Sequence, residues 1–225
     1  MSFDGPETRD YRNVVALNSA YLKLIGSERV LARGIAGCQG PLRQRIMSLQ
    51  RTESQRLAET PFLLFSFRER DDRYWDGILD ENRDPGLFRS SGSEAVDTLI
   101  SAALGFIWQL ANRNPYTLRL ICGSTLYWCD RIADLTFYGL LDAVRNSGDV
   151  PLLRESASNL LWRKLLDEGV SVDHEIRRAA QLASLQALLT DPTATKATGG
   201  NWALAARAAS APGLRVAEER QRSER

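Results

Sequence analysis

The chain has very few of the side chains that most often carry acid–base or metal chemistry. It contains a single histidine, His174, among 225 residues. One histidine excludes a metal site built on two imidazoles, and a serine or cysteine nucleophile activated by histidine would have to use this one. His174 lies within VDHEI in the first turn of a predicted surface helix, and no G-x-S-x-G motif accompanies it. We therefore predict a solvated or capping residue and assign no catalytic residue.

Cysteines and long apolar runs are also scarce. The chain has only three cysteines, Cys38, Cys122 and Cys129. This number is small and odd, which argues against a disulfide framework. No run of about 18 apolar residues suggests a membrane span, and the first ten residues lack the basic start and apolar stretch of a signal peptide. We therefore expect a cytoplasmic protein with buried, unreactive thiols.

Neither sign of charge is in excess. The chain has 29 basic and 28 acidic residues, so no global field draws it toward nucleic acid or a membrane. Only three of the basic residues are lysines, and arginine's rigid guanidinium suits bidentate contacts to carboxylates or phosphates. A hydrophobic fraction of 44% is ordinary for a globular protein and excludes wholesale disorder.

Apolar residues recur at helical spacing through most of the chain, which predicts an all-α, bundle-like protein. Helices are expected at about 11–25, 41–57, 74–79, 94–110, 115–144, 153–168 and 172–189. Ser91 with Glu94 forms a capping box, and Asn114 followed by Pro115 is a second helix start. The exception is the apolar run PFLLFSF at 61–67, where we expect a short strand or a helix start.

Glycine, proline and serine concentrate at residues 83–93, which makes this stretch the best internal boundary. We therefore predict an N-terminal helical interaction region at 1–90 and a C-terminal helical bundle at 91–190. Residues 191–225 are rich in alanine, threonine and glycine, with Trp202 as the only large apolar anchor. This composition predicts a flexible tail.

Three aspartates, Asp72, Asp76 and Asp80, are spaced at i, i+4 and i+8 and would share one helical face. Carboxylates in such a row can hold Mg²⁺ for a diphosphate substrate, as in the aspartate-rich motif of all-α isoprenoid synthases. No second acidic motif accompanies them, and arginines are interleaved with them, which is typical of a salt-bridged solvent face. We therefore assign no metal and no cofactor, and keep a Mg²⁺-dependent enzyme as an alternative function.

Four arginines on one predicted helix, Arg43, Arg45, Arg51 and Arg56, are candidate phosphate contacts. Residues 125–144 have room for a helix-turn-helix, but their side chains are mostly apolar, which favours an ordinary packed helix.

Three features from Leu17 to Phe67 resemble the FlhD family, the subunit of the bacterial flagellar transcription activator that acts in complex with FlhC. They are LNSAYLKLI at 17–25, Gly34 with Ile35, and LAETPFLLFSF at 57–67. Phe65 replaces a cysteine of some members, and the chain after about residue 90 exceeds the family's usual length. The resemblance implies an all-α dimerising domain that acts in transcription through a partner.

The sequence therefore favours a non-enzymatic regulatory or interaction protein that forms a homodimer and binds DNA, if at all, within a complex. The expected association surface is Leu17, Tyr21, Leu24, Phe62 and Phe65. The alternative for these five residues is that they are core, as apolar side chains usually are. The alternative for the function is a helical adaptor or assembly factor unrelated to transcription.

Overall fold

The computed structural model describes residues 5–26, 41–79, 91, 93–147, 151–154 and 160–190. Within them the chain forms ten helices and one two-stranded ribbon, which confirms the all-α prediction. The elements are α1 (Thr8–Ile25), α3 (Pro41–Met47), α4 (Arg51–Ala58), β1 (Phe65–Ser66), α5 (Asp72–Ile78), α6 (Glu94–Arg113), α7 (Pro115–Cys122), α8 (Leu126–Asp134), α9 (Phe137–Ser147), β2 (Leu152–Leu153), α10 (Leu160–Asp167) and α11 (His174–Thr190). None of these helices is long and apolar enough to cross a membrane. The predicted tail at 191–225 lies outside the described residues.

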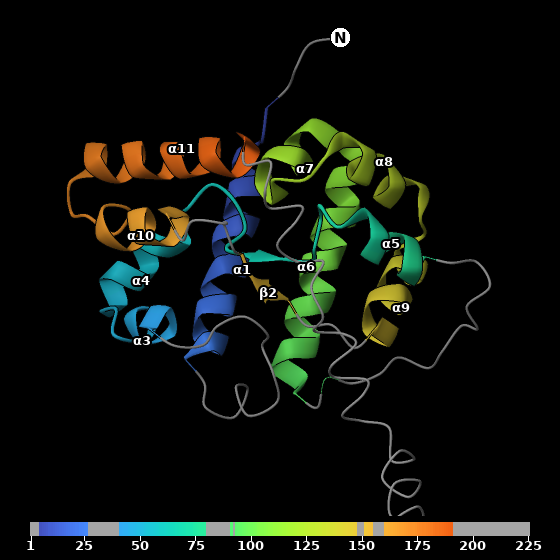
Figure 1. The fold of residues 1–225 in the computed structure, drawn as a ribbon, viewed down its shortest axis with the longest axis horizontal. Helices are drawn as coiled ribbons and strands as arrows, with labels where there is room; N and C mark the ends of the chain where they lie inside the picture. Colours follow the sequence, from blue (N-terminus) through green and yellow to red (C-terminus); the bar gives the residue numbers. More distant parts are fainter. Residues whose placement is uncertain are drawn as a thin grey trace, which may run out of the picture.

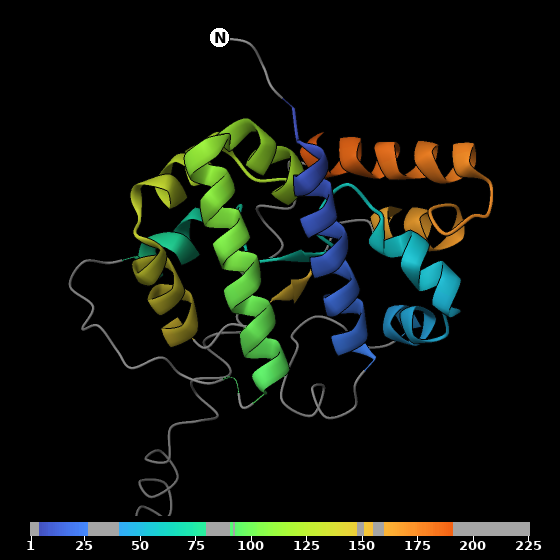
Figure 2. The same ribbon diagram turned by 180° about the vertical axis from the view of Figure 1, so that it is seen from behind.

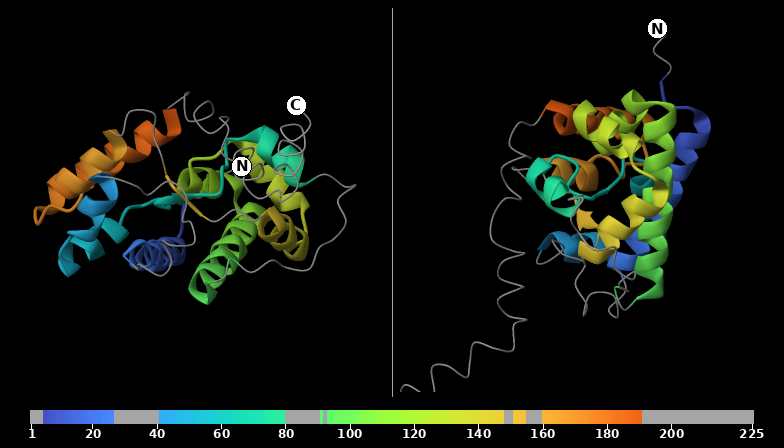
Figure 3. Two further views of the ribbon diagram at one scale, coloured as in Figure 1. Left: turned by 60° about the horizontal axis from the view of Figure 1, so that its bottom comes forward. Right: turned by 90° about the vertical axis from the view of Figure 1, so that its right-hand side faces the viewer.

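The two longest helices, α1 and α6, lie side by side on one face of the molecule (Figure 2). Helices α3, α4, α10 and α11 flank α1, while α5, α7, α8 and α9 flank α6 (Figure 1). The short β1–β2 ribbon lies between the two groups, and the right-hand view of Figure 3 shows it to the left of the layer of α1 and α6. The arrangement is two groups of short helices joined by a central helical pair.

Local sequence signals explain where α1 and α6 begin and how they pack. Helix α1 starts with a capping box between Glu7 and Asp10, and Gly26 ends it as predicted. Helix α6 starts after Ser93, so the predicted capping box that begins at Ser91 is wrong by two residues. Arg113, in the last turn of α6, places one guanidinium nitrogen 2.6 Å from each carboxylate oxygen of Asp10. This ion pair joins the end of α6 to the start of α1.

The apolar run at 61–67 contains the predicted strand. Phe65 pairs with Leu153, and Ser66 pairs with Leu152, in antiparallel register. Strand β2 was not predicted, because residues 153–168 read as one helix; that helix begins only at Leu160. The leucines from residue 153 onward have helical spacing, so the sequence predicted a helix where the structure has the strand β2.

Two buried polar side chains hold the backbone of this run. Asn18 of α1 donates from Nδ2 to the carbonyl of Phe62 at 3.0 Å, and its Oδ1 accepts from the amide of Leu64 at 2.9 Å. The guanidinium of Arg154, only 4% exposed, donates to the carbonyls of Leu63, Phe65 and Cys122 at 2.6, 2.6 and 2.7 Å. These bonds stand in for the neighbouring strands that a larger sheet would supply.

The charge of Arg154 is balanced by a buried carboxylate. Glu69, 2% exposed, lies 3.2 Å from Arg154 Nη2 and accepts a hydrogen bond from the Ser66 hydroxyl at 2.5 Å. The Trp162 indole donates to the carbonyl of Arg154 at 2.6 Å, which attaches α10 to the same network. One arginine thus links the ribbon, α7 and α10.

Two predicted helices are broken in the structure. The helix expected at 41–57 divides into α3 and α4, because Gln50 forms a new capping box with Glu53. The helix expected at 115–144 divides into α7, α8 and α9. The first break falls at Gly123, whose φ is +63°, and Gly139 lies inside α9 without breaking it. The second break falls at Leu135 and Thr136.

A single core runs across the boundary predicted at 83–93. Buried apolar residues from Val14 in α1 to Leu188 in α11 form one contiguous cluster. Helices α1 and α6, which lie on opposite sides of that boundary, pack directly against each other. Among the described residues, therefore, the two predicted regions share one core.

We expect Arg154→Met to lower the free energy of unfolding by about 3–5 kcal/mol, because it leaves the buried Glu69 carboxylate and three carbonyls without their partner. Urea denaturation followed by circular dichroism measures the change. Arg163→Met on α10, where the side chain is 80% exposed, is the matched control and should change stability by less than about 0.5 kcal/mol. Equal, small effects of both substitutions would contradict the role given to Arg154.

Candidate functional site

Helices α7 and α8 form a helix-turn-helix arrangement. Eight residues of α7 and nine of α8 are joined by the three-residue turn Gly123–Thr125. Asn114 caps α7 by accepting from the amide of Thr117, as predicted, and Thr125 caps α8 by accepting from the amide of Trp128. A short turn with glycine in the left-handed region is typical of this motif. The motif begins ten residues before the stretch 125–144, in which the sequence allowed for it, and overlaps the first half of that stretch.

One face of α8 is anchored in the core. Trp128, Cys129 and Ile132 are each no more than 1% exposed. The Trp128 ring meets the Trp75 ring of α5 edge to face, with centroids 5.5 Å apart. This packing fixes which residues of α8 face outward.

The outward face of α8 combines an aromatic ring with carboxylates. Tyr127 is 59% exposed, and Asp130 and Asp134 are exposed beside it. Arg131 lies 2.7 Å from Asp76 of α5, and its guanidinium also lies 5.5 Å from the centre of the Tyr127 ring. The arginine of this face is therefore neutralised, and the face carries net negative charge.

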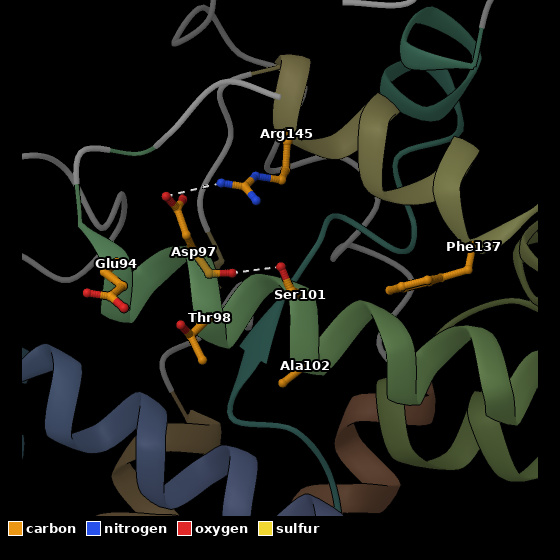
Figure 4. Close-up of a pocket in the computed structure, with 7 residues that line it drawn as sticks. All are labelled: Glu94, Asp97, Thr98, Ser101, Ala102, Phe137 and Arg145. Carbon is orange, nitrogen blue, oxygen red and sulfur yellow. Dashed lines mark hydrogen bonds and ion pairs between the residues drawn. The ribbon is translucent and has the colours of Figure 1, made fainter. Parts of the chain in front are cut away.

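A hollow of about 880 Å³ lies between α6 and α9 (Figure 4). Its lining residues are Glu94, Asp97, Thr98, Ser101, Ala102, Phe137 and Arg145. Arg145 and Asp97 form an ion pair at 3.1 Å, and the second Asp97 oxygen accepts from the amide of Ser91 at 3.0 Å. Because both oxygens of this carboxylate already accept, it is poorly placed to act as a base. The hollow has a polar side, where Asp97 and Arg145 are paired and Glu94 is exposed, and an apolar end at Phe137 (Figure 4).

The five residues predicted for association lie in the core. Leu17, Tyr21, Leu24, Phe62 and Phe65 are each no more than 8% exposed. The Tyr21 and Phe65 rings touch each other, with centroids 4.9 Å apart. Their burial within one chain corrects the predicted surface in favour of its alternative. Self-association remains a prediction and would need a different surface.

The four arginines predicted as phosphate contacts do not share a helix. Arg43 and Arg45 lie on α3, and Arg51 and Arg56 lie on α4. Arg45 is paired with Asp167 of α10 at 2.6 Å, and Arg56 donates to the carbonyl of Val170 at 3.2 Å. Two of the four are thus engaged in joining α3 and α4 to α10 and the residues that follow it.

The two described members of the predicted aspartate row are both exposed, and one of them forms an ion pair. Asp72 is exposed in the first turn of α5, and Asp76 is paired with Arg131. Asp80 lies outside the described residues. Among those that are described, no three histidine, cysteine, aspartate or glutamate side chains gather as a metal site. His174 is exposed and lies 3.4 Å from Glu175.

The segments that resemble FlhD pack against each other. Residues 17–25 belong to α1, and residues 57–67 run from the end of α4 through β1. Asn18 joins them by donating to the carbonyls of Ala58 and Phe62. Gly34 and Ile35 lie outside the described residues. No protein-family model, curated protein or solved structure matches the chain, so the resemblance remains a prediction.

Both described cysteines are buried thiols with raised pKa values. Burial raises the pKa of Cys129 from 9.0 to about 11, and it raises that of Cys122 well above its ordinary value. The thiolate is the reactive form of cysteine, so neither group is suited to act as a nucleophile near neutral pH.

We expect Cys129 to react with iodoacetamide about 100-fold more slowly in the folded protein than in urea at about pH 8, because its raised pKa reduces the thiolate fraction by about that factor. Peptide mapping by mass spectrometry reports Cys122 and Cys129 separately. Iodoacetamide labelling of Cys129 at the same rate in the folded protein and in urea would contradict the burial of this thiol.

The raised pKa of Cys129 also predicts a pH dependence of stability. As the pH rises from 9.0 toward 11, the folded protein keeps a proton that the unfolded chain releases, so the free energy of unfolding should fall.

Proposed function

We propose that this chain is a helical regulatory protein that acts by binding a partner protein through the outward face of α8. The observation that carries the proposal is the side-chain set of that face: the exposed ring of Tyr127, the carboxylates of Asp130 and Asp134, and an arginine already paired with Asp76. Tyrosine is enriched in protein interfaces because its rigid ring contributes contact area and a hydrogen-bonding hydroxyl.

The same face disfavours direct binding to DNA. In a DNA-binding helix-turn-helix, the second helix enters the major groove between two rows of phosphates. Asp130 and Asp134 would be repelled there, and Arg131 is neutralised by Asp76. A role in transcription would therefore be exercised through a partner that supplies the DNA contacts. This agrees with what the FlhD resemblance implies.

Capture from a host lysate with the full chain as bait tests the binding face. We expect Tyr127→Ala and Asp130→Lys each to reduce recovery of the captured protein at least about tenfold, since an exposed aromatic anchor and a charge reversal act directly on an interface. Tyr11→Ala, on α1 at 40% exposure, is the matched control and should leave recovery unchanged. Recovery that is insensitive to both α8 substitutions would overturn the proposal.

A gel shift at stated salt separates a transcription regulator from an adaptor. We expect the isolated chain to leave DNA fragments from its host's promoters unshifted, and the complex with its captured partner to retard them, because the partner supplies the cationic contacts. A complex that also leaves every fragment unshifted would favour the adaptor. Retardation by the isolated chain would contradict the electrostatic argument from α8.

A further inference from the structure

Helix α11 joins the two groups of helices that flank α1 and α6. Its first half lies along α10, Gln181 donates to the carbonyl of Arg56 in α4, and Arg177 is paired with Glu59, the residue after α4. Its last turn lies beside α7 in both Figure 1 and Figure 2. The helix therefore bridges one group to the other at the level of the helix-turn-helix.

Only a small part of α11 enters the core. Ala180, Ser184 and Leu188 are its buried residues; Leu188 belongs to the contiguous apolar cluster, and the partly buried Leu185 packs against that cluster. Two apolar side chains of the helix, Ile176 and Leu182, are instead about half exposed, at 48% and 53%. A long helix with so little buried apolar surface is typical of the elements that open locally while the remaining core stays folded.

The contact of Leu188 falls directly on the turn between α7 and α8. A β-carbon added at Gly123 would lie 2.5 Å from Leu188 Cγ, so the leucine fills the space that only glycine leaves open. Arg70, from the loop before α5, donates from Nε to the carbonyl of Gly123 at 2.6 Å and from Nη2 to the carbonyl of Leu188. One guanidinium thus bonds the turn and the end of α11 together.

We propose that α11 is a clamp on the α7–α8 turn and regulates the binding face of α8. With Leu188 seated on Gly123, the two helices are held at one angle and Tyr127 is preorganised for a partner. When α11 lifts from the turn, the angle between α7 and α8 is no longer fixed, and the outward face of α8 loses affinity for its partner. The regulation of partner binding by α11 rests on the proposed function. The contact of α11 with the α7–α8 turn does not, because it lies within this chain.

Hydrogen exchange of the full chain, without any partner, tests the clamp. In Leu188→Ala, amides of residues 123–128 and 184–190 should exchange at least about tenfold faster, while amides in the middle of α1 and α6 keep their protection. Leu182→Ala is the matched control, because it removes the same side chain from the exposed side of α11. It should leave the exchange at 123–128 unchanged.

A double-mutant cycle tests the contact itself. Gly123→Ala places a methyl group against Leu188 and also strains the left-handed backbone, so it should destabilise the protein. Leu188→Ala makes room for that methyl group. The double variant should therefore be more stable than the sum of the two single effects predicts.

Three results would overturn the clamp. They are unchanged exchange at 123–128 in Leu188→Ala, equal acceleration throughout α1 and α6, and strict additivity in the cycle. None of them depends on a partner, so they are distinct from a failure of Tyr127→Ala to reduce capture. A loss of the proposed function would leave the exchange result standing.

Discussion

The fold depends on how the backbone of residues 61–67 is satisfied in the middle of the molecule. The run is almost wholly buried, yet only Phe65 and Ser66 pair with a neighbouring strand. Buried amides and carbonyls need partners, and here Asn18 and Arg154 supply them from α1 and from the residue after β2. The Leu63 amide also donates to the Ile121 carbonyl of α7 at 3.0 Å, so two side chains and one neighbouring helix together take the place of the rest of a sheet.

Most of the architecture follows from local chemistry, which is why it could be predicted. Helix α1 ends at Gly26, α7 starts from Asn114 and Pro115, and the apolar stripe of α6 has helical spacing. These signals act within one or two turns, so they can be read without knowledge of neighbours. Strand β2 could not be found in this way, because it forms only by pairing with β1. Its Leu153 pairs with Phe65, which lies 88 residues earlier in the sequence.

The candidate site was missed for a related reason. The apolar spacing of α7 continues into α8 across the turn, and a continuous helix satisfies that spacing equally well. The available signal was Gly123 followed two residues later by Thr125, a helix-ending residue and then a capping residue. The neutralisation of Arg131 by Asp76 could not be read at all, since the two residues lie on different helices that only the folded core brings together. Phe62 and Phe65 were predicted to lie on an association surface, but both are buried in the core.

The dependence of the run on Arg154 also orders events during synthesis. Translation proceeds from the N-terminus, so PFLLFSF leaves the ribosome about 90 residues before the guanidinium that binds its carbonyls. Throughout that interval Asn18 is already present to bind Phe62 and Leu64, whereas the carbonyls of Leu63 and Phe65 lack the guanidinium that binds them in the folded chain. The bonds between Arg154 and the run can therefore form only after residue 154 has been synthesised.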